Sequence, residues 1–195
     1  MGIGRRCYSI MPVSLAATSA AGTSGALVPI ATIRGNNAAT QISFSNIPQI
    51  YQDLMVVASG NLSLFTGNPG YTMWLNGNFT NIYSVVALTG DGATLVSSSQ
   101  TPTAVFYPNL YLQSPSVTFP ETLVAHFPNY RNTSINKTAL FRVGSDRNGS
   151  GRTTYSIGLA QTTSAITAID IGTNWGDSFF ASGFTANLYG IRAGN

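Results

Sequence analysis

The chain has 195 residues, of which only 8% are charged, and a net charge of +3 at pH 7. Ser, Thr and Asn occupy 59 positions and Gly another 20. This length fits one domain, or one domain with an arm, and the cations are spread along the chain rather than clustered as in nucleic-acid-binding proteins, so we expect no nucleic-acid partner. No continuous apolar run is long enough to span a bilayer, so we also expect no membrane partner.

The first 37 residues contain no acidic residue and are rich in Ala, Ser, Thr and Gly, a composition typical of a linker or tail. Apolar residues are nevertheless scattered through them, and an arm that stayed in water would be less apolar. We therefore expect residues 1–37 to form an extended N-terminal arm that docks on another subunit or on its own domain. The alternative is that part of this stretch, above all residues 27–34, is the first strand of the body. The residues expected to make the arm's contacts are Tyr8, Ile10, Met11, Val13, Leu15, Leu27, Val28, Ile30 and Ile33.

The start of the chain also resembles a secretory signal, with two Arg, an apolar stretch and then small residues. Tyr8, Pro12 and Ser14 interrupt the apolar stretch, so we do not expect a signal peptide. The single Cys7 cannot form an internal disulfide, and the chain has too few Cys and His for a structural zinc site. We expect no metal and no cofactor.

From residue 38 to residue 195 short runs alternate between apolar and polar residues, and Gly, Asn, Asp and Pro separate them. No segment has a sustained period of 3.6, and prolines interrupt the longer stretches. We predict an all-β body over 38–195, an antiparallel two-sheet sandwich or jelly roll of about eight to ten strands, with hydroxyl and amide groups on its outer face. The expected strands lie at 41–45, 54–58, 71–75, 82–88, 104–112, 123–127, 139–143, 155–159, 169–171 and 184–188.

Two local details follow from the same reading. Asn76-Gly77 is a candidate hairpin turn, because both residues accept positive φ. Residues 54–58 are apolar on both faces, which predicts a central strand.

Side chains able to perform catalysis are scarce. The only His, His126, alternates with apolar residues, and we interpret it as a structural or surface residue on the opposite face of its strand. Asp91 and Asp146 have the surroundings of turn residues. Asp170 and Asp177 could approach each other across a turn that carries Trp175, which leaves a glycan-cleaving or lectin site open. We expect no catalytic residues and no enzymatic activity.

Several segments stand out in order over roughly residues 28–192: Val28–Thr32, Ile42–Leu54, Trp74–Gly77, Ala125–Tyr130 with Asn136-Lys137, Ala165–Ile169 and Phe184–Ile191. Taken together, these segments resemble virion proteins of tailed bacteriophages. The second contains the phrase F-x-x-I-P-x-x-Y-x-D-L, which leads into a long strand in those proteins. In this phrase we expect Tyr51 to plug one end of the sandwich and Asp53 to cap backbone N–H groups.

The resemblance implies a structural component of the virion without fixing its location, and it does not imply catalysis. The favoured hypothesis is a capsid decoration, or cement, protein on the outer capsid surface. Its partners would be the major capsid protein and neighbouring copies of itself, in a homotrimer. The alternative is a tail or fibre component that binds a host-surface glycan through exposed aromatic residues, for which the candidates are Tyr107, Tyr111, Tyr130 and Trp175.

Overall fold

Within the residues that the structure describes, the chain forms eleven antiparallel strands in two sheets. The structure is a computed structural model, and it describes residues 26–63, 70–109, 119–173 and 179–193. Within these ranges the chain is all-β, as predicted. The strands are β1 Leu27–Arg34, β2 Gln41–Phe44, β3 Asp53–Gly60, β4 Tyr71–Leu75, β5 Tyr83–Gly90, β6 Leu95–Thr103, β7 Glu121–Phe127, β8 Lys137–Ser145, β9 Arg152–Ala160, β10 Ile169–Thr173 and β11 Thr185–Ile191.

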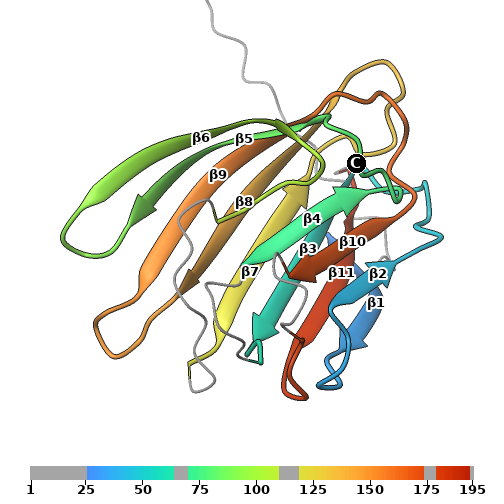
Figure 1. Cartoon of the computed structure of the whole chain (residues 1–195). Helices are drawn as coiled ribbons and strands as arrows, with labels where there is room; N and C mark the ends of the chain where they lie inside the picture. Colours follow the sequence, from blue (N-terminus) through green and yellow to red (C-terminus); the bar gives the residue numbers. More distant parts are fainter. Residues whose placement is uncertain (1–25, 64–69, 110–118, 174–178, 194–195) are drawn as a thin grey trace, which may run out of the picture.

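The larger sheet has eight strands in the order β1-β11-β3-β7-β8-β9-β5-β6, and the smaller has three in the order β2-β10-β4. The small sheet lies over one face of the large one, as the strands at the front of Figure 1 show. The predicted β-sandwich is therefore confirmed. The strand over 54–58 does lie inside the large sheet, because β3 pairs with both β11 and β7.

The core fills the space between the two sheets. Alternate residues of the large sheet's strands point into this space, so that β8, for example, alternates buried and exposed positions along its length. β4 is buried at every position. Phe106 makes edge-to-face contacts with Tyr83, at a centroid distance of 4.7 Å, and with Phe141, at 5.4 Å. Such aromatic contacts join the strands of the large sheet to the loop that carries Phe106.

The first strand corrects the expected boundary of the arm. Residues 27–34, assigned above to an arm over 1–37, form β1, which pairs with β11 at the edge of the large sheet. Val28, Ile30 and Ile33 pack against the core of their own domain. The alternative interpretation, a first strand of the body, is therefore the one that holds for this stretch. Of the expected arm contacts, Tyr8, Ile10, Met11, Val13 and Leu15 lie outside the described residues.

The strand expected at 104–112 is also wrong. The edge strand β6 lies earlier, at Leu95–Thr103, and residues 104–108 form a loop whose only ladder contact is a bridge from Phe106 to Met73. β6 escaped prediction because it is largely exposed and rich in Ser, so it lacks the apolar alternation that identifies half-buried strands. Residues 110–112 lie outside the described ranges.

Asn76 and Gly77 both have positive φ, 55° and 65°, as the predicted turn requires. The turn does not close a hairpin, however, because β4 belongs to the small sheet and β5 to the large one. The Asn76 side chain holds the opposite loop, since its Oδ1 accepts bonds from the backbone N–H groups of Thr167 (2.8 Å) and Ala168 (2.9 Å). The turn thus links the two sheets at one end.

No helix in the described residues has the length and hydropathy needed to cross a membrane.

Candidate interaction surface

The single His pairs with an acid on the outer face of the large sheet, which is the face turned away from the small sheet. His126 Nε2 lies 3.1 Å from Asp53 Oδ2, and Asp53 Oδ1 accepts a 2.8 Å bond from the Asn129 backbone N–H. Tyr51, only 7% exposed, packs over Gly190. Tyr51 is thus buried in the core, and Asp53 caps one backbone N–H, so the contacts of Asp53 are those of a residue that holds a loop.

Three other acids are engaged in local structure. Asp91 accepts bonds from the N–H groups of Ala93 and Thr94, which lower the pKa of its carboxyl to about 2. Asp146 accepts a 2.8 Å bond from Gly149 N–H, so both residues occupy turns as predicted. Asp170 is 6% exposed and accepts a 2.5 Å bond from Ser43 Oγ.

The suggested approach of Asp170 to Asp177 involves a residue outside the described ranges. Among the residues that are described, no group of three His, Cys, Asp or Glu side chains could hold a metal ion.

Two further ionisable side chains are withdrawn from water. Lys137 is 2% exposed, and its Nζ donates to the carbonyl oxygens of Asn132, Ile135 (3.0 Å) and Thr163 (3.1 Å), so it ties two loops together. Burial lowers the pKa of this amine. Burial also raises the pKa of the Glu121 carboxyl to about 7, against the opposing effect of the Arg147 charge. Neither group lies on the outer face.

The strand register places apolar side chains in two neighbouring rows on the outer face. The first row contains Val86, Ile157, Leu140 and His126, on β5, β9, β8 and β7 in that order. The second contains Leu88, Tyr155, Arg142 and Val124 on the same strands. We call the five large apolar side chains of these rows on β5, β8 and β9 the apolar patch: Val86, Leu88, Leu140, Tyr155 and Ile157.

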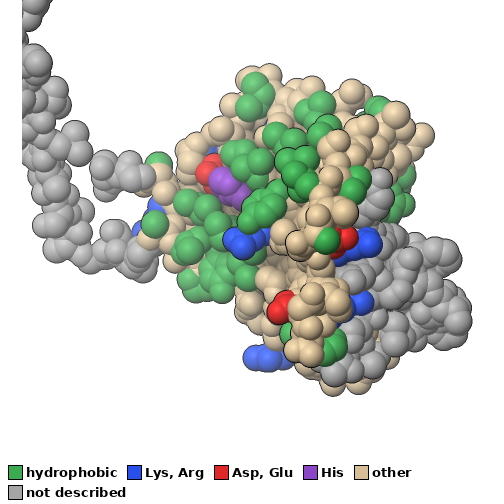
Figure 2. All heavy atoms as spheres, turned by 90° about the vertical axis from the view of Figure 1, so that its left-hand side faces the viewer, with side chains coloured by type: hydrophobic (Ala, Val, Ile, Leu, Met, Phe, Trp, Pro, Cys, Tyr) green, Lys and Arg blue, Asp and Glu red, His purple; other side chains and the backbone are tan. Residues whose placement is uncertain are grey.

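Each side chain of the apolar patch is about half exposed, from 48% for Leu140 to 58% for Val86. Figure 2 views this side of the molecule and shows hydrophobic side chains gathered around the His. An exposed face of an antiparallel sheet is normally polar, and a contiguous apolar area on a soluble protein typically marks a contact site. The expectation of a hydroxyl- and amide-covered outer face is therefore wrong over these strands. On β6 the outward-facing residues Ser97 and Ser99 do match that expectation.

A polar border surrounds the apolar patch. The Arg142 guanidinium lies over the Tyr155 ring, 5.3 Å from its centroid, and the pair of His126 and Asp53 stands at the other side. An apolar centre within a polar border is the usual anatomy of a protein–protein contact.

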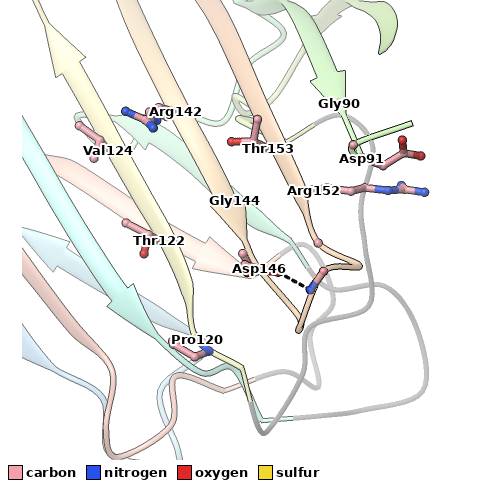
Figure 3. Close-up of a pocket in the computed structure, with 14 residues that line it drawn as sticks. Gly90, Asp91, Pro120, Thr122, Val124, Arg142, Gly144, Asp146, Arg152 and Thr153 are labelled. Carbon is pink, nitrogen blue, oxygen red and sulfur yellow. Dashed lines mark hydrogen bonds between the residues drawn. The ribbon is translucent and has the colours of Figure 1, made fainter. Parts of the chain in front are cut away.

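Next to the second row the outer face is hollowed. The next row of paired residues contains Gly90, Thr153, Gly144 and Thr122. Because these residues are small, the surface of the sheet is recessed here. The turns after β5 and β8, with Asp91 and Asp146, rise around it in Figure 3, and the cavity has a volume of about 620 Å³. Asp91 and Asp146 are bonded within their own turns, and the hollow is also lined by Thr122, Thr153, Arg142 and Arg152.

Of the four aromatic residues suggested for glycan stacking, the structure describes two, and neither is widely exposed. Tyr130 is fully buried, Tyr107 is half-buried, and Tyr111 and Trp175 lie outside the described residues. Leu27 is the one expected arm contact in β1 that remains widely exposed, at 49%.

The apolar patch was not predicted because the alternation over 155–159 does not reveal which face of β9 points inward. Tyr155, Ile157 and Leu159 share a face, but that face is the outer one, and the inner positions hold Ser156 and Gly158. A Cβ on Gly158 would lie 2.6 Å from the Phe106 ring, so the inner position must be small to admit that ring. A usable signal was the run Val85-Val86-Ala87-Leu88, which is apolar on both faces of β5.

Comparison with protein-family models, with curated proteins and with solved structures gives no match to this chain.

Proposed function

We propose that this chain is a non-enzymatic structural protein of a bacteriophage virion, and specifically a capsid decoration (cement) protein bound to the outer capsid surface. Its partners are the major capsid protein and neighbouring copies of itself, arranged as a homotrimer, and the N-terminal arm contributes to these contacts. The observation that carries the proposal is the apolar patch, which a protein working alone in water has no reason to keep exposed.

Two further features support an assembly role. The described acids hold turns and loops or are withdrawn from water, which leaves no arrangement suited to acid–base or nucleophilic chemistry within the described ranges. The resemblance of residues 28–192 to phage virion proteins supplies the class of assembly. The arm that remains ahead of β1 contains Tyr8, Ile10 and Met11, which suit it to bury apolar surface against a neighbour.

The test is particle binding by a chain that lacks residues 2–26. This truncation ends just before β1 and so leaves every described strand in place. We expect a folded protein that no longer binds particles from which the native protein has been stripped. Undiminished binding would contradict the role of the arm. A quantitative gel of purified virions gives the copy number: hundreds of copies support decoration, and absence from the virion rejects the proposal as a whole.

The second candidate function is a tail or fibre component that binds a host-surface glycan. Its specific support is Tyr155, which is 52% exposed and is held by Arg142 beside the hollow, because an aromatic face next to hydroxyl and guanidinium donors suits a sugar ring. A copy number of a few per particle, together with loss of glycan binding in Tyr155→Ala, would favour this candidate.

A further inference from the structure

We infer that the apolar patch is the docking site for residues 8–15 of the N-terminal arm of a neighbouring copy. This inference rests on the proposed function, because it identifies the surface through which copies of the chain are linked. It adds a specific occupant and a specific receptor, both within this sequence.

The size of the apolar patch fits a segment better than a second sheet. An aromatic side chain such as Tyr presents roughly 150–250 Å² when fully exposed, and Val, Leu and Ile are smaller, so the five half-exposed side chains present at most about 500 Å². A stable interface of standard size takes about 800 Å² from each partner. Two copies meeting only through this patch would fall short of that area. A bound segment can instead cover the patch and also contact the residues around it, so it does not need a second flat face of the same size.

The charges also favour the arm over a second copy of the patch. Arg142 stands within the second row, between Val124 and Tyr155. Face-to-face contact of two patches would place both Arg142 guanidinium groups in one interface, and like charges within a contact oppose binding. Residues 8–15, YSIMPVSL, carry no charge.

The pattern of the segment matches a flat apolar receptor. Met11, Val13 and Leu15 alternate with Pro12 and Ser14, so an extended chain would turn all three to one side. Pro12 favours an extended conformation at the residue before it. It also donates no backbone bond, which costs nothing when the segment lies across the face of a sheet rather than within its ladder.

The lengths agree as well. On the outer face, β5 and β3 are separated by four strand spacings, or about 19 Å. The first row extends as far as β3, where the half-buried Met55 lies beside His126. Eight extended residues span about 26 Å, enough to cross this distance. The twelve steps from Leu15 to Leu27 extend up to about 40 Å, so the segment can leave its own sheet edge and reach a second molecule.

The test uses two full-length variants and their mixture, followed by sedimentation velocity. Ile157→Asp places a charge in the centre of the patch, and the double variant M11D/V13D places charges in the segment. We expect the unchanged chain to associate and each variant alone to dissociate, with the dissociation constant raised about tenfold or more. Mixing the two variants should restore a 1:1 complex, because one intact segment then meets one intact patch.

The matched control is Ile50→Asp, which changes the same residue type at a position that is 71% exposed and outside the patch, and which should leave association unchanged. Urea unfolding checks that Ile157→Asp remains folded. If it does not, Leu140→Ser replaces it, since this residue pairs with Ile157 on the same face.

Three results would overturn the inference: an unchanged chain that is monomeric, association that survives in M11D/V13D, or a mixture that fails to form the 1:1 complex. Survival in M11D/V13D would identify direct patch-to-patch contact instead. These outcomes are independent of the virion gel, so a failure of arm docking and a failure of the proposed function are distinguished.

Discussion

The large sheet has two faces that carry apolar side chains, and among the described residues only one of the two faces is covered. The inner face, with Leu123 and Phe141, is closed by the small sheet, whereas the outer face leaves Leu140 and Ile157 about half exposed. Leu140 and Phe141 are neighbours in the chain, and they point to opposite faces of the sheet. Apolar side chains therefore have two roles in this sheet. Those on the inner face stabilise the fold by being buried, and those on the outer face are available to bind a partner.

The difference between the two faces is tested most directly by truncating one Leu to Ala on each face. Leu123→Ala, on the inner face of β7, should lower the free energy of unfolding by about 2–5 kcal/mol, because it leaves a cavity in a packed core. Leu140→Ala, on the outer face of β8, should cost less than about 1 kcal/mol in the dissociated protein. Urea unfolding at low protein concentration measures both. Equal losses would show that the outer face is covered within a single chain.

A second prediction concerns pH at the end of the inner face. The pKa of the Glu121 carboxyl is raised to about 7, from 4.5, chiefly because burial disfavours its charged form. The folded state therefore holds this proton more tightly than the unfolded state. The stability contributed by the neutral carboxyl is full below pH 4.5 and is lost as the pH rises through about 7.

The total loss from this group should not exceed about 3.5 kcal/mol. Glu121→Gln keeps the shape and removes the titration, so the variant should be more stable than the parent at pH 8 and comparable to it at pH 4.5. Urea midpoints at the two pH values provide the measurement. If the difference between parent and variant is the same at both, Glu121 is not held in its neutral form by the fold.

A third prediction uses glycines that lie on opposite faces. A Cβ at Gly158 would meet the Phe106 ring at 2.6 Å, whereas a Cβ at Gly90, on the outer side, finds its nearest neighbour at 3.8 Å. Gly158→Ala should therefore destabilise the fold by about 1–3 kcal/mol through overpacking. Gly90→Ala should change stability by less than about 0.5 kcal/mol. Thermal unfolding of the two variants tests the difference, and a tolerated Gly158→Ala would mean that Phe106 can move aside.

These glycines also show what the sequence could and could not predict. Alternation identified nine of the eleven strands within a few residues, because a half-buried strand places apolar residues at every second position. It could not decide which face of β9 is inner, since Tyr155 and Ile157 are larger than Ser156 and Gly158. That choice depends on Phe106, a residue about fifty positions away in the chain, whose ring needs the room. The apolar patch was missed for the same reason.

The smallest expected effect lies at the border of the apolar patch. Asp53 accepts a bond from the Asn129 N–H and contacts His126 on the outer face, and Asn129 has a positive φ of 50° in the loop that leads to the buried Tyr130. Asp53→Ala should cost about 1 kcal/mol, because it leaves the Asn129 N–H without its acceptor. Asp53→Asn keeps an acceptor oxygen and should cost less. If Asp53→Ala destabilises the dissociated protein more than Leu140→Ala does, the polar border contributes more to the stability of the fold than the apolar patch does. The exposed side chains of the patch would then act in association rather than in folding.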